Sequence, residues 1–80
     1  MHYVYLLESQ ADGKRHYVGS TRNLKVRLAG HNAGQNQSTI AGRPWNLVGY
    51  LALADERKAV AFEKYLKSGS GKIFAKRHFL

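Results

Sequence analysis

The stretch YVYLLESQADGKRHYVGSTRNLKVRLAGHNAG, residues 3–34, predicts the first half of the fold. Aromatic and β-branched residues in YVYLL and HYVGS favour strands, and the Asp-Gly pair between them is a turn signal. The sequence therefore predicts a β-hairpin over residues 3–20. Thr21 or Asn23 can cap a helix of about residues 24–33, which a glycine ends.

The remaining residues predict a third strand and two more helices. WNLVGYLALA, residues 45–54, is mostly apolar and is the predicted third strand, and acidic residues then open a helix over about 55–68. The triplet GSG is expected to break this helix, and KIFAKRHFL to form a short basic terminal helix. The polar segment GQNQSTIAGRP, residues 34–44, is predicted to be a mobile loop. Together these elements predict one α/β domain of the α+β type over residues 1–80.

The composition favours an anionic partner. Thirteen Lys and Arg residues against five Asp and Glu residues give a formal charge of +8, which is typical of proteins that bind nucleic acid. The chain has no cysteine, which fits a reducing, cytoplasmic setting. The first strand starts too early for a signal peptide, and no apolar run could span a membrane, so no membrane partner is expected.

The five carboxylates limit the metal chemistry that the chain can support. A two-metal hydrolase needs several carboxylates that converge on one point. Any metal chemistry here is therefore expected to use a single ion with very few protein ligands. The carboxylates are Glu8, Asp12, Asp55, Glu56 and Glu63.

Glu63 lies on the apolar face of its predicted helix, beside Ala59, Phe62 and Leu66. Burying an unpaired carboxylate is costly, so such a residue usually has a partner or a metal. An ion pair with an arginine is one interpretation. A divalent ion held by this carboxylate, waters and substrate phosphates is the other, and this arrangement suits Mg²⁺.

Arg27 and His31 lie one turn apart on a helical stripe that also carries Leu24 and Leu28. The arginine either lays its stem on apolar surface or binds a phosphate through its planar guanidinium. The histidine is either structural or a hydrogen-bond donor or proton carrier beside the same phosphate.

Tyrosines gather on the predicted hairpin, where Tyr3 and Tyr5 share a face of one strand, and Tyr17 and Gly19 a face of the other. Such a cluster is usually packing. A phenol can nevertheless accept a proton when nearby cations favour its ionisation. The glycine would let a backbone or a ligand approach closely.

In this order, the residues resemble the GIY-YIG nuclease superfamily. Tyr3-Val4-Tyr5 stands where the family has GIY, and Tyr17-Val18-Gly19 where it has YIG. STRNLKVRLAGHN and AFEKYLK then carry the arginine, the histidine and the glutamate. The resemblance covers nearly the whole chain. It is strongest to the small, single-domain bacterial members, which are related to the nuclease domain of the excision-repair incision enzyme.

The resemblance implies a three-stranded antiparallel sheet flanked by helices. It also implies an endonuclease that hydrolyses DNA phosphodiester bonds with one divalent ion, Mg²⁺ or Mn²⁺, in DNA repair or recombination. Matched by position, Glu63 would bind the metal and Arg27 would grip the scissile phosphate. Tyr17 would be the general base, Tyr5 would line the site and help to place the water, and His31 would lie beside the phosphate.

The chain departs from the family at two positions. Tyr3 replaces the glycine of GIY, and Ser20 follows YVG where several relatives carry a lysine that could favour the phenolate of Tyr17. No targeting module is recognisable, so specificity for DNA, including structured or branched DNA, would come from the domain or from a partner. A chain this small is expected to need a second copy of itself or another protein to cut both strands.

Two alternatives to the nuclease stay open on the sequence alone. The first is a nucleic-acid-binding module that has the nuclease fold but little or no turnover. The second is a basic interaction protein in which Glu63 is only ion-paired to Arg27.

Overall fold

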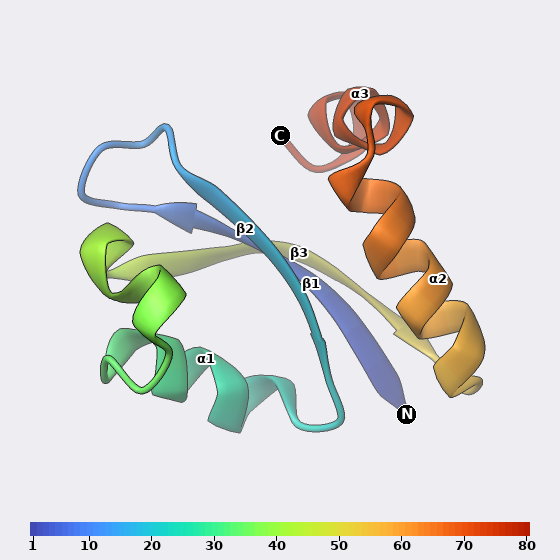
Figure 1. The fold of residues 1–80 in the computed structure, drawn as a ribbon, viewed down its shortest axis with the longest axis horizontal. Helices are drawn as coiled ribbons and strands as arrows, with labels where there is room; N and C mark the ends of the chain where they lie inside the picture. The colour runs from blue at the N-terminus through green and yellow to red at the C-terminus, as the bar shows by residue number, and fades with distance from the viewer.

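The computed structural model describes residues 1–80, and a three-stranded antiparallel sheet forms its centre (Figure 1). Strand β1 (His2–Ser9) lies between β2 (His16–Thr21) and β3 (Trp45–Leu53) and pairs antiparallel with both. This arrangement confirms the predicted hairpin and the predicted sheet. It also makes β2 an edge strand.

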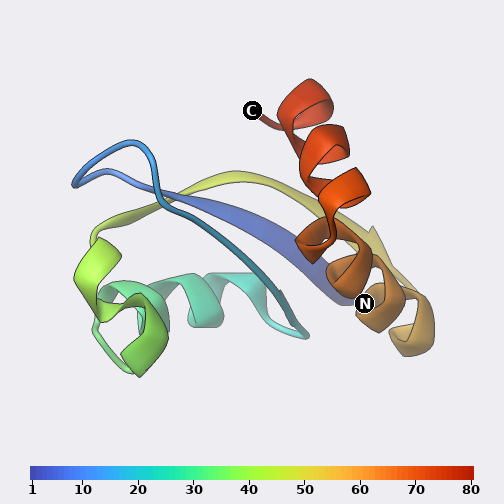
Figure 2. The same cartoon turned by 45° about the horizontal axis from the view of Figure 1, so that its top comes forward.

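Helices cover both faces of the sheet (Figure 2). Helix α1 (Leu24–Asn32) and the short 3-10 helix η1 (Gln37–Gly42) lie on one face. Helices α2 (Glu56–Lys67) and α3 (Gly69–His78) lie on the other. None of these helices has the length and the apolar character that crossing a membrane requires.

The alternation of side chains along β1 supplies a core on each face of the sheet. Val4 and Leu6 pack on the face that α2 and α3 cover. Tyr5 and Leu7 pack on the opposite face together with Trp45, beneath α1. β1 therefore contributes side chains to the core on both faces of the sheet.

Helix α1 is positioned by its cap and by its apolar stripe. The side chain of Asn23, one of the two predicted caps, accepts a hydrogen bond from a backbone N–H in the first turn. Leu24 and Leu28 pack on the core around Tyr5, and His31, further along the same stripe, is fully buried. Arg27 lies at the margin of the stripe, where its side chain is exposed.

The prediction of a mobile loop over residues 34–44 is wrong for the part that forms η1. The side chain of Asn36 caps η1 by accepting a hydrogen bond from the backbone N–H of Ser38 at 3.1 Å. Thr39 is buried, and its carbonyl accepts a 2.8 Å hydrogen bond from the indole of Trp45. The polar residues that suggested a loop therefore cap a helix and fasten it to the core.

The GSG triplet is part of α3, so the terminal helix begins at Gly69 instead of Lys72. Ser68 ends α2 and caps α3, since its hydroxyl accepts a 3.2 Å hydrogen bond from the N–H of Gly71. A Cβ atom at Gly71 would overlap the carbonyl of Tyr65. This glycine permits the sharp corner between the two helices, which the sequence suggested was only a break.

Candidate active site

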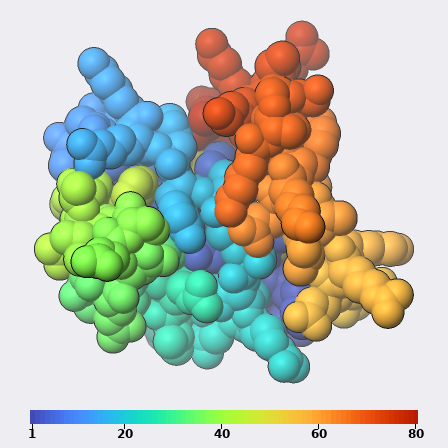
Figure 3. Space-filling model, viewed as in Figure 1, coloured from blue at the N-terminus to red at the C-terminus, as the bar shows by residue number.

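Most of the residues singled out by the sequence lie around the edge strand β2, between the two helical layers. Tyr17 and Gly19 pair with β1 on the face that carries Tyr5, whereas Ser20 faces α2. Figure 3 shows β2 in light blue, with α1 and η1 in teal and green on one side and α2 and α3 in orange on the other. Side chains from both faces of the sheet can therefore meet at this edge.

Because Gly19 has no side chain, the side chain of Tyr5 can lie across β2 at this position. A Cβ atom at Gly19 would lie 2.5 Å from the phenol oxygen of Tyr5, closer than unbonded atoms can approach. Any other residue would push the ring away. The close approach expected at this glycine is therefore made by a side chain of the protein itself.

Tyr5 begins a buried chain of hydrogen bonds that runs through His31. The phenol oxygen of Tyr5 lies 2.8 Å from Nε2 of His31, and Nδ1 of His31 lies 2.9 Å from the hydroxyl of Thr39. The hydroxyl of Thr39 donates its proton to the carbonyl of Asn36 at 3.1 Å. It must therefore accept from Nδ1–H of His31, which leaves Nε2 to accept from Tyr5.

Burial keeps the two rings of this chain uncharged. Burial raises the pKa of Tyr5 to about 12; Tyr17 adds to the rise, and the Arg27 guanidinium opposes it. Burial, followed by the charge of Arg27, lowers the pKa of His31. Near neutral pH, Tyr5 is therefore a protonated donor and His31 a neutral acceptor.

His31 is buried against the tyrosines and also lines a cavity next to Arg27. Its side chain is 0% exposed, and both of its ring nitrogens are engaged. Its ring meets that of Tyr17 edge-on, with centroids 4.9 Å apart. The expectation that His31 lies beside the phosphate stays a prediction, and the ring could donate to a phosphate only after one of its two hydrogen bonds breaks.

Thr39→Val is expected to lower the free energy of unfolding by about 1–3 kcal/mol. Valine has nearly the shape of threonine, but it leaves Nδ1–H of His31 without an acceptor in the protein interior. Urea denaturation would measure the loss. Ser38→Ala removes an exposed hydroxyl from the same helix and is expected to cost less than about 0.5 kcal/mol. Equal losses in the two variants would contradict the prediction.

The lowered pKa of His31 predicts that stability falls as the pH drops below neutral. The unfolded chain binds a proton at this residue before the folded chain does, near its ordinary pKa of about 6.5. The stabilising contribution is therefore complete above that pH and is lost as the pH falls through it. Urea denaturation from about pH 7 to 5 should show this loss.

The same titration has a matched control. In His31→Gln, the part of the pH dependence that belongs to this residue is expected to disappear. His78→Gln, which changes an exposed histidine on α3, should keep the dependence of the unaltered chain. A His31→Gln protein with an unchanged slope of stability against pH would contradict the prediction.

Glu63 is partly buried on α2, and both of its carboxylate oxygens are engaged. The hydroxyl of Ser20 donates to Oε1 at 2.6 Å, and the ammonium of Lys67 donates to Oε2 at 2.7 Å. Burial raises the pKa of Glu63, but the hydrogen bonds from Lys67 and Ser20 outweigh burial and hold the pKa below its usual range. The carboxylate is therefore charged. Its partner is a lysine, so the interpretation of an ion pair with an arginine is wrong.

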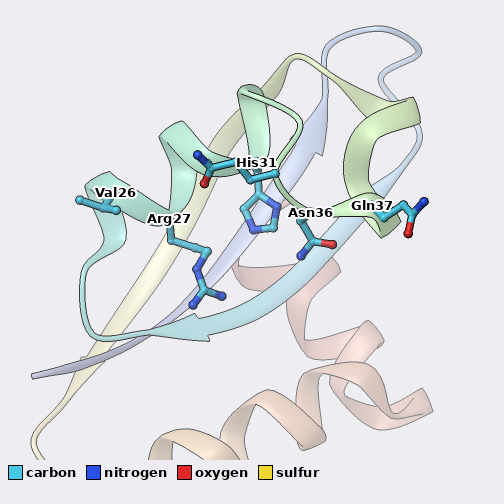
Figure 4. Close-up of a pocket in the computed structure, with 7 residues that line it drawn as sticks. Val26, Arg27, His31, Asn36 and Gln37 are labelled. Atoms are coloured by element: carbon cyan, nitrogen blue, oxygen red, sulfur yellow. The ribbon is translucent and has the colours of Figure 1, made fainter.

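Arg27 is a cation without an ion pair at this edge. Its side chain extends from α1 toward β2 (Figure 4), is exposed and forms no ion pair. Its charge lowers the pKa of Tyr5, on one face of the sheet, and contributes to lowering that of Glu63, on the other. The guanidinium thus acts on both halves of the candidate site and remains available to an anion.

Sequence reasoning missed the polar side chains that surround Arg27. An open cavity of about 390 Å³ next to Arg27 is lined mostly by polar residues, and the labelled side chains of Asn36 and Gln37 extend from the segment that opens η1 (Figure 4). The amide-rich run QNQ after the predicted helix was the available signal. A second cavity, on the α2 side of Arg27, is lined by Ser20 and Glu56 among others.

The residues fit a single metal ion bound by one carboxylate. No three His, Asp or Glu side chains converge to form a multidentate metal site. A carboxylate offers about four lone-pair positions, and hydrogen bonds use two of those of Glu63. A bound cation would repel the ammonium of Lys67, whose side chain is 53% exposed and can turn away. Glu63 alone would then be the protein ligand of Mg²⁺ or Mn²⁺.

Two tyrosine-bearing strands, followed by an arginine, a histidine and a glutamate on flanking helices, define this α+β domain. Residues 1–77 match the model of the GIY-YIG catalytic domain. The chain is also 35% identical over 68 residues to a UPF0213 protein of Clostridium perfringens, and the match covers 84% of this chain and 71% of that relative. The chain therefore belongs to the GIY-YIG family. This membership implies a nuclease-type fold.

Proposed function

We propose that the chain is a metal-dependent endonuclease that hydrolyses phosphodiester bonds in DNA. The observation that carries this proposal is the exposed guanidinium of Arg27, whose charge acts on Tyr5 on one face of the sheet and on the charged Glu63 on the other. A phosphate bound at this edge would meet a cation, a carboxylate and a phenol from three different elements. The formal charge of +8 supports a polyanionic substrate.

Arg27 and Glu63 would act on the phosphate. The planar guanidinium can donate two parallel hydrogen bonds to the scissile phosphate and stabilise the negative charge that develops on it. Glu63 would hold one Mg²⁺ or Mn²⁺, with Ser20 fixing the orientation of the carboxylate through its 2.6 Å hydrogen bond. Such an ion supplies Lewis-acid stabilisation of the phosphate oxygens when it is bound.

Tyr17 would accept the proton of the attacking water. Tyr17 would first lose its phenol proton to solvent. The water oxygen then forms a bond to phosphorus as its proton passes to the phenolate, and the bond from phosphorus to the 3′ oxygen breaks, so that the 3′ oxygen leaves as an alkoxide and takes a proton from solvent. Tyr5 and His31 would position this ring, because both of their rings lie against it. Tyr5 itself, with a pKa of about 12, stays protonated and is therefore a support for the base and not the base.

Cleavage assays test this proposal. Labelled single-stranded, duplex, flapped and branched DNA, and RNA, would be incubated with the protein in Mg²⁺ or Mn²⁺ and, in parallel, in EDTA. Cleavage of DNA that requires the ion is expected. No cleavage of any substrate in either ion would overturn hydrolysis. Sedimentation with and without DNA would show whether a second copy of the chain takes part.

A nucleic-acid-binding module with this fold is the second candidate. The observation that favours it is the engagement of both oxygens of Glu63 by Ser20 and Lys67, which leaves a metal ion in competition with an ammonium group. This candidate predicts salt-sensitive binding to DNA without cleavage, and no effect of Glu63→Ala on binding.

For the nuclease, we propose DNA repair or recombination in the cytoplasm as the biological setting, by similarity to the excision-repair incision enzyme.

A further inference from the structure

We propose that unpaired nucleotides bind in a groove between β2 and α3, so that the substrate is DNA with bases splayed out beside the scissile phosphate. The inference rests on the proposed function. The groove has a volume of about 800 Å³, which is in the range of pockets that take a drug-sized ligand. Figure 3 shows a hollow between the blue residues that precede β2 and the orange and red residues of α3.

The floor of the groove is apolar. Leu6, Val18 and Leu66 line it, and Leu80, which is 52% exposed, lies at its margin. Apolar surface of this kind gains from contact with the flat face of a base. In a duplex, these faces are stacked inside the helix and only the backbone and the groove edges are offered to a protein. An unpaired base fits this floor, whereas a paired base does not.

The rim of the groove is basic. Lys67, Lys72 and Lys76 line it, and the last two lie one turn apart on α3. Neither Lys72 nor Lys76 forms an ion pair. Three ammonium groups along an apolar floor match a strand that carries one phosphate for each base. The only acidic side chain in the lining, that of Glu8, already contacts His16 at 3.1 Å.

The groove is continuous with the candidate active site. Lys67 lines the groove, and its ammonium also contacts Glu63. Tyr17 lines the groove as well, and its ring also packs on His31. A strand whose phosphate lies at Arg27 and Glu63 would therefore continue into the groove with its next bases. The shared residues make this surface an extension of the same substrate path.

Binding in EDTA tests the role of the bases. The probes are a labelled twelve-nucleotide DNA strand, the same strand with three adjacent abasic sites, and a blunt duplex. The two single strands carry equal charge, so only the bases differ. Loss of the bases is expected to weaken binding about tenfold, and the duplex is expected to bind more weakly than the intact strand despite its higher charge density.

Two pairs of variants show whether the strand binds in the groove. Leu80→Glu is expected to weaken binding of the intact strand at least about fivefold more than Ile73→Glu, an equal change on an exposed side of α3 outside the groove. Lys72→Ala combined with Lys76→Ala should reduce the slope of log affinity against log salt by about 1.4. Lys58→Ala combined with Lys64→Ala removes the same charge from α2, outside the groove, and should leave this slope nearly unchanged.

Several outcomes would overturn the inference. Equal affinity for the intact and the abasic strand would show that the bases make no contact. A poly-glutamate peptide of equal charge that displaces the strand as well as unlabelled DNA does would show a site for acidic peptides instead. Metal-dependent cleavage that is as fast on duplex as on single strands, and unchanged in the groove variants, would overturn the groove and keep the nuclease. Base-dependent binding without cleavage would keep the groove and overturn hydrolysis.

Discussion

Glu63→Gln is expected to lower the rate of metal-dependent DNA cleavage by about three orders of magnitude, the scale of losing a main electrostatic stabiliser of a transition state. Glutamine keeps the size of the side chain and an oxygen that can accept from Ser20. It removes the negative charge that would hold Mg²⁺ or Mn²⁺. Single-turnover cleavage of a labelled strand, measured over a range of Mg²⁺ concentrations, gives the rate.

The same variant is expected to bind DNA at least as tightly as the unaltered chain, because it removes a negative charge from a basic surface. Asp12→Asn is the matched control. It makes the same change of charge in the exposed hairpin turn and keeps the oxygen that accepts from two backbone N–H groups. Cleavage should be unchanged in this control. A Glu63→Gln protein that cleaves as fast as the Asp12→Asn protein would remove Glu63 from the site.

The parts of the fold that the sequence predicted depend on local patterns. The aromatic and β-branched residues of YVYLL and HYVGS favour strands, and the Asp-Gly pair in the connection between them, residues 10–15, marks a turn, so the local pattern is enough to predict the hairpin. The stripe of α1 placed Leu24, Leu28 and His31 on one inward face because helical spacing alone determines that face. These features need no knowledge of the rest of the chain.

The predictions that were wrong concern residues whose structure depends on contacts between distant parts of the chain. Thr39 is eight residues beyond His31 in a polar run, and only the packing of η1 beneath Trp45 turns it into a buried acceptor. A composition typical of loops carries no information about such a partner. Lys67 is different. It follows Glu63 by four residues on one helix, a spacing that favours an ion pair, so this partner of Glu63 was predictable from the sequence.

Ser20, which follows the YVG motif, has a defined partner in the structure. The resemblance implied a lysine in several relatives at this position, whereas Ser20 here donates a hydrogen bond to Glu63. The other oxygen of the same carboxylate binds Lys67. A positive charge is therefore still present at this edge of the sheet, although it comes from α2 and not from β2. Its side chain is more than half exposed, so under the proposed function it would turn from Glu63 toward a substrate phosphate when a metal ion takes its place.

Arg27→Ala is expected to slow cleavage by about 10²–10³-fold, because it removes the free cation that would stabilise the developing charge on the phosphate. Arg27→Lys keeps the charge but loses the planar pair of donors, so its rate should lie between those of the alanine variant and the unaltered chain. Lys25→Ala, an exposed change on the same helix, is the matched control and should cleave normally. Single-turnover rates measure all three variants.

A second readout of Arg27 does not depend on cleavage. Its charge contributes to lowering the pKa of Glu63 and lowers that of Tyr5, so Arg27→Ala should raise both. Since the folded pKa of Glu63 lies below its ordinary value, its stabilising contribution is present above that value and is lost as the pH falls. Arg27→Ala should make this acid-side loss smaller. An NMR titration of the Glu63 carboxyl, with Lys25→Ala beside it, measures the shift. If the alanine variant at position 27 leaves both the Glu63 titration and the cleavage rate unchanged, the guanidinium does not act on this edge of the sheet, and the phosphate site must lie elsewhere.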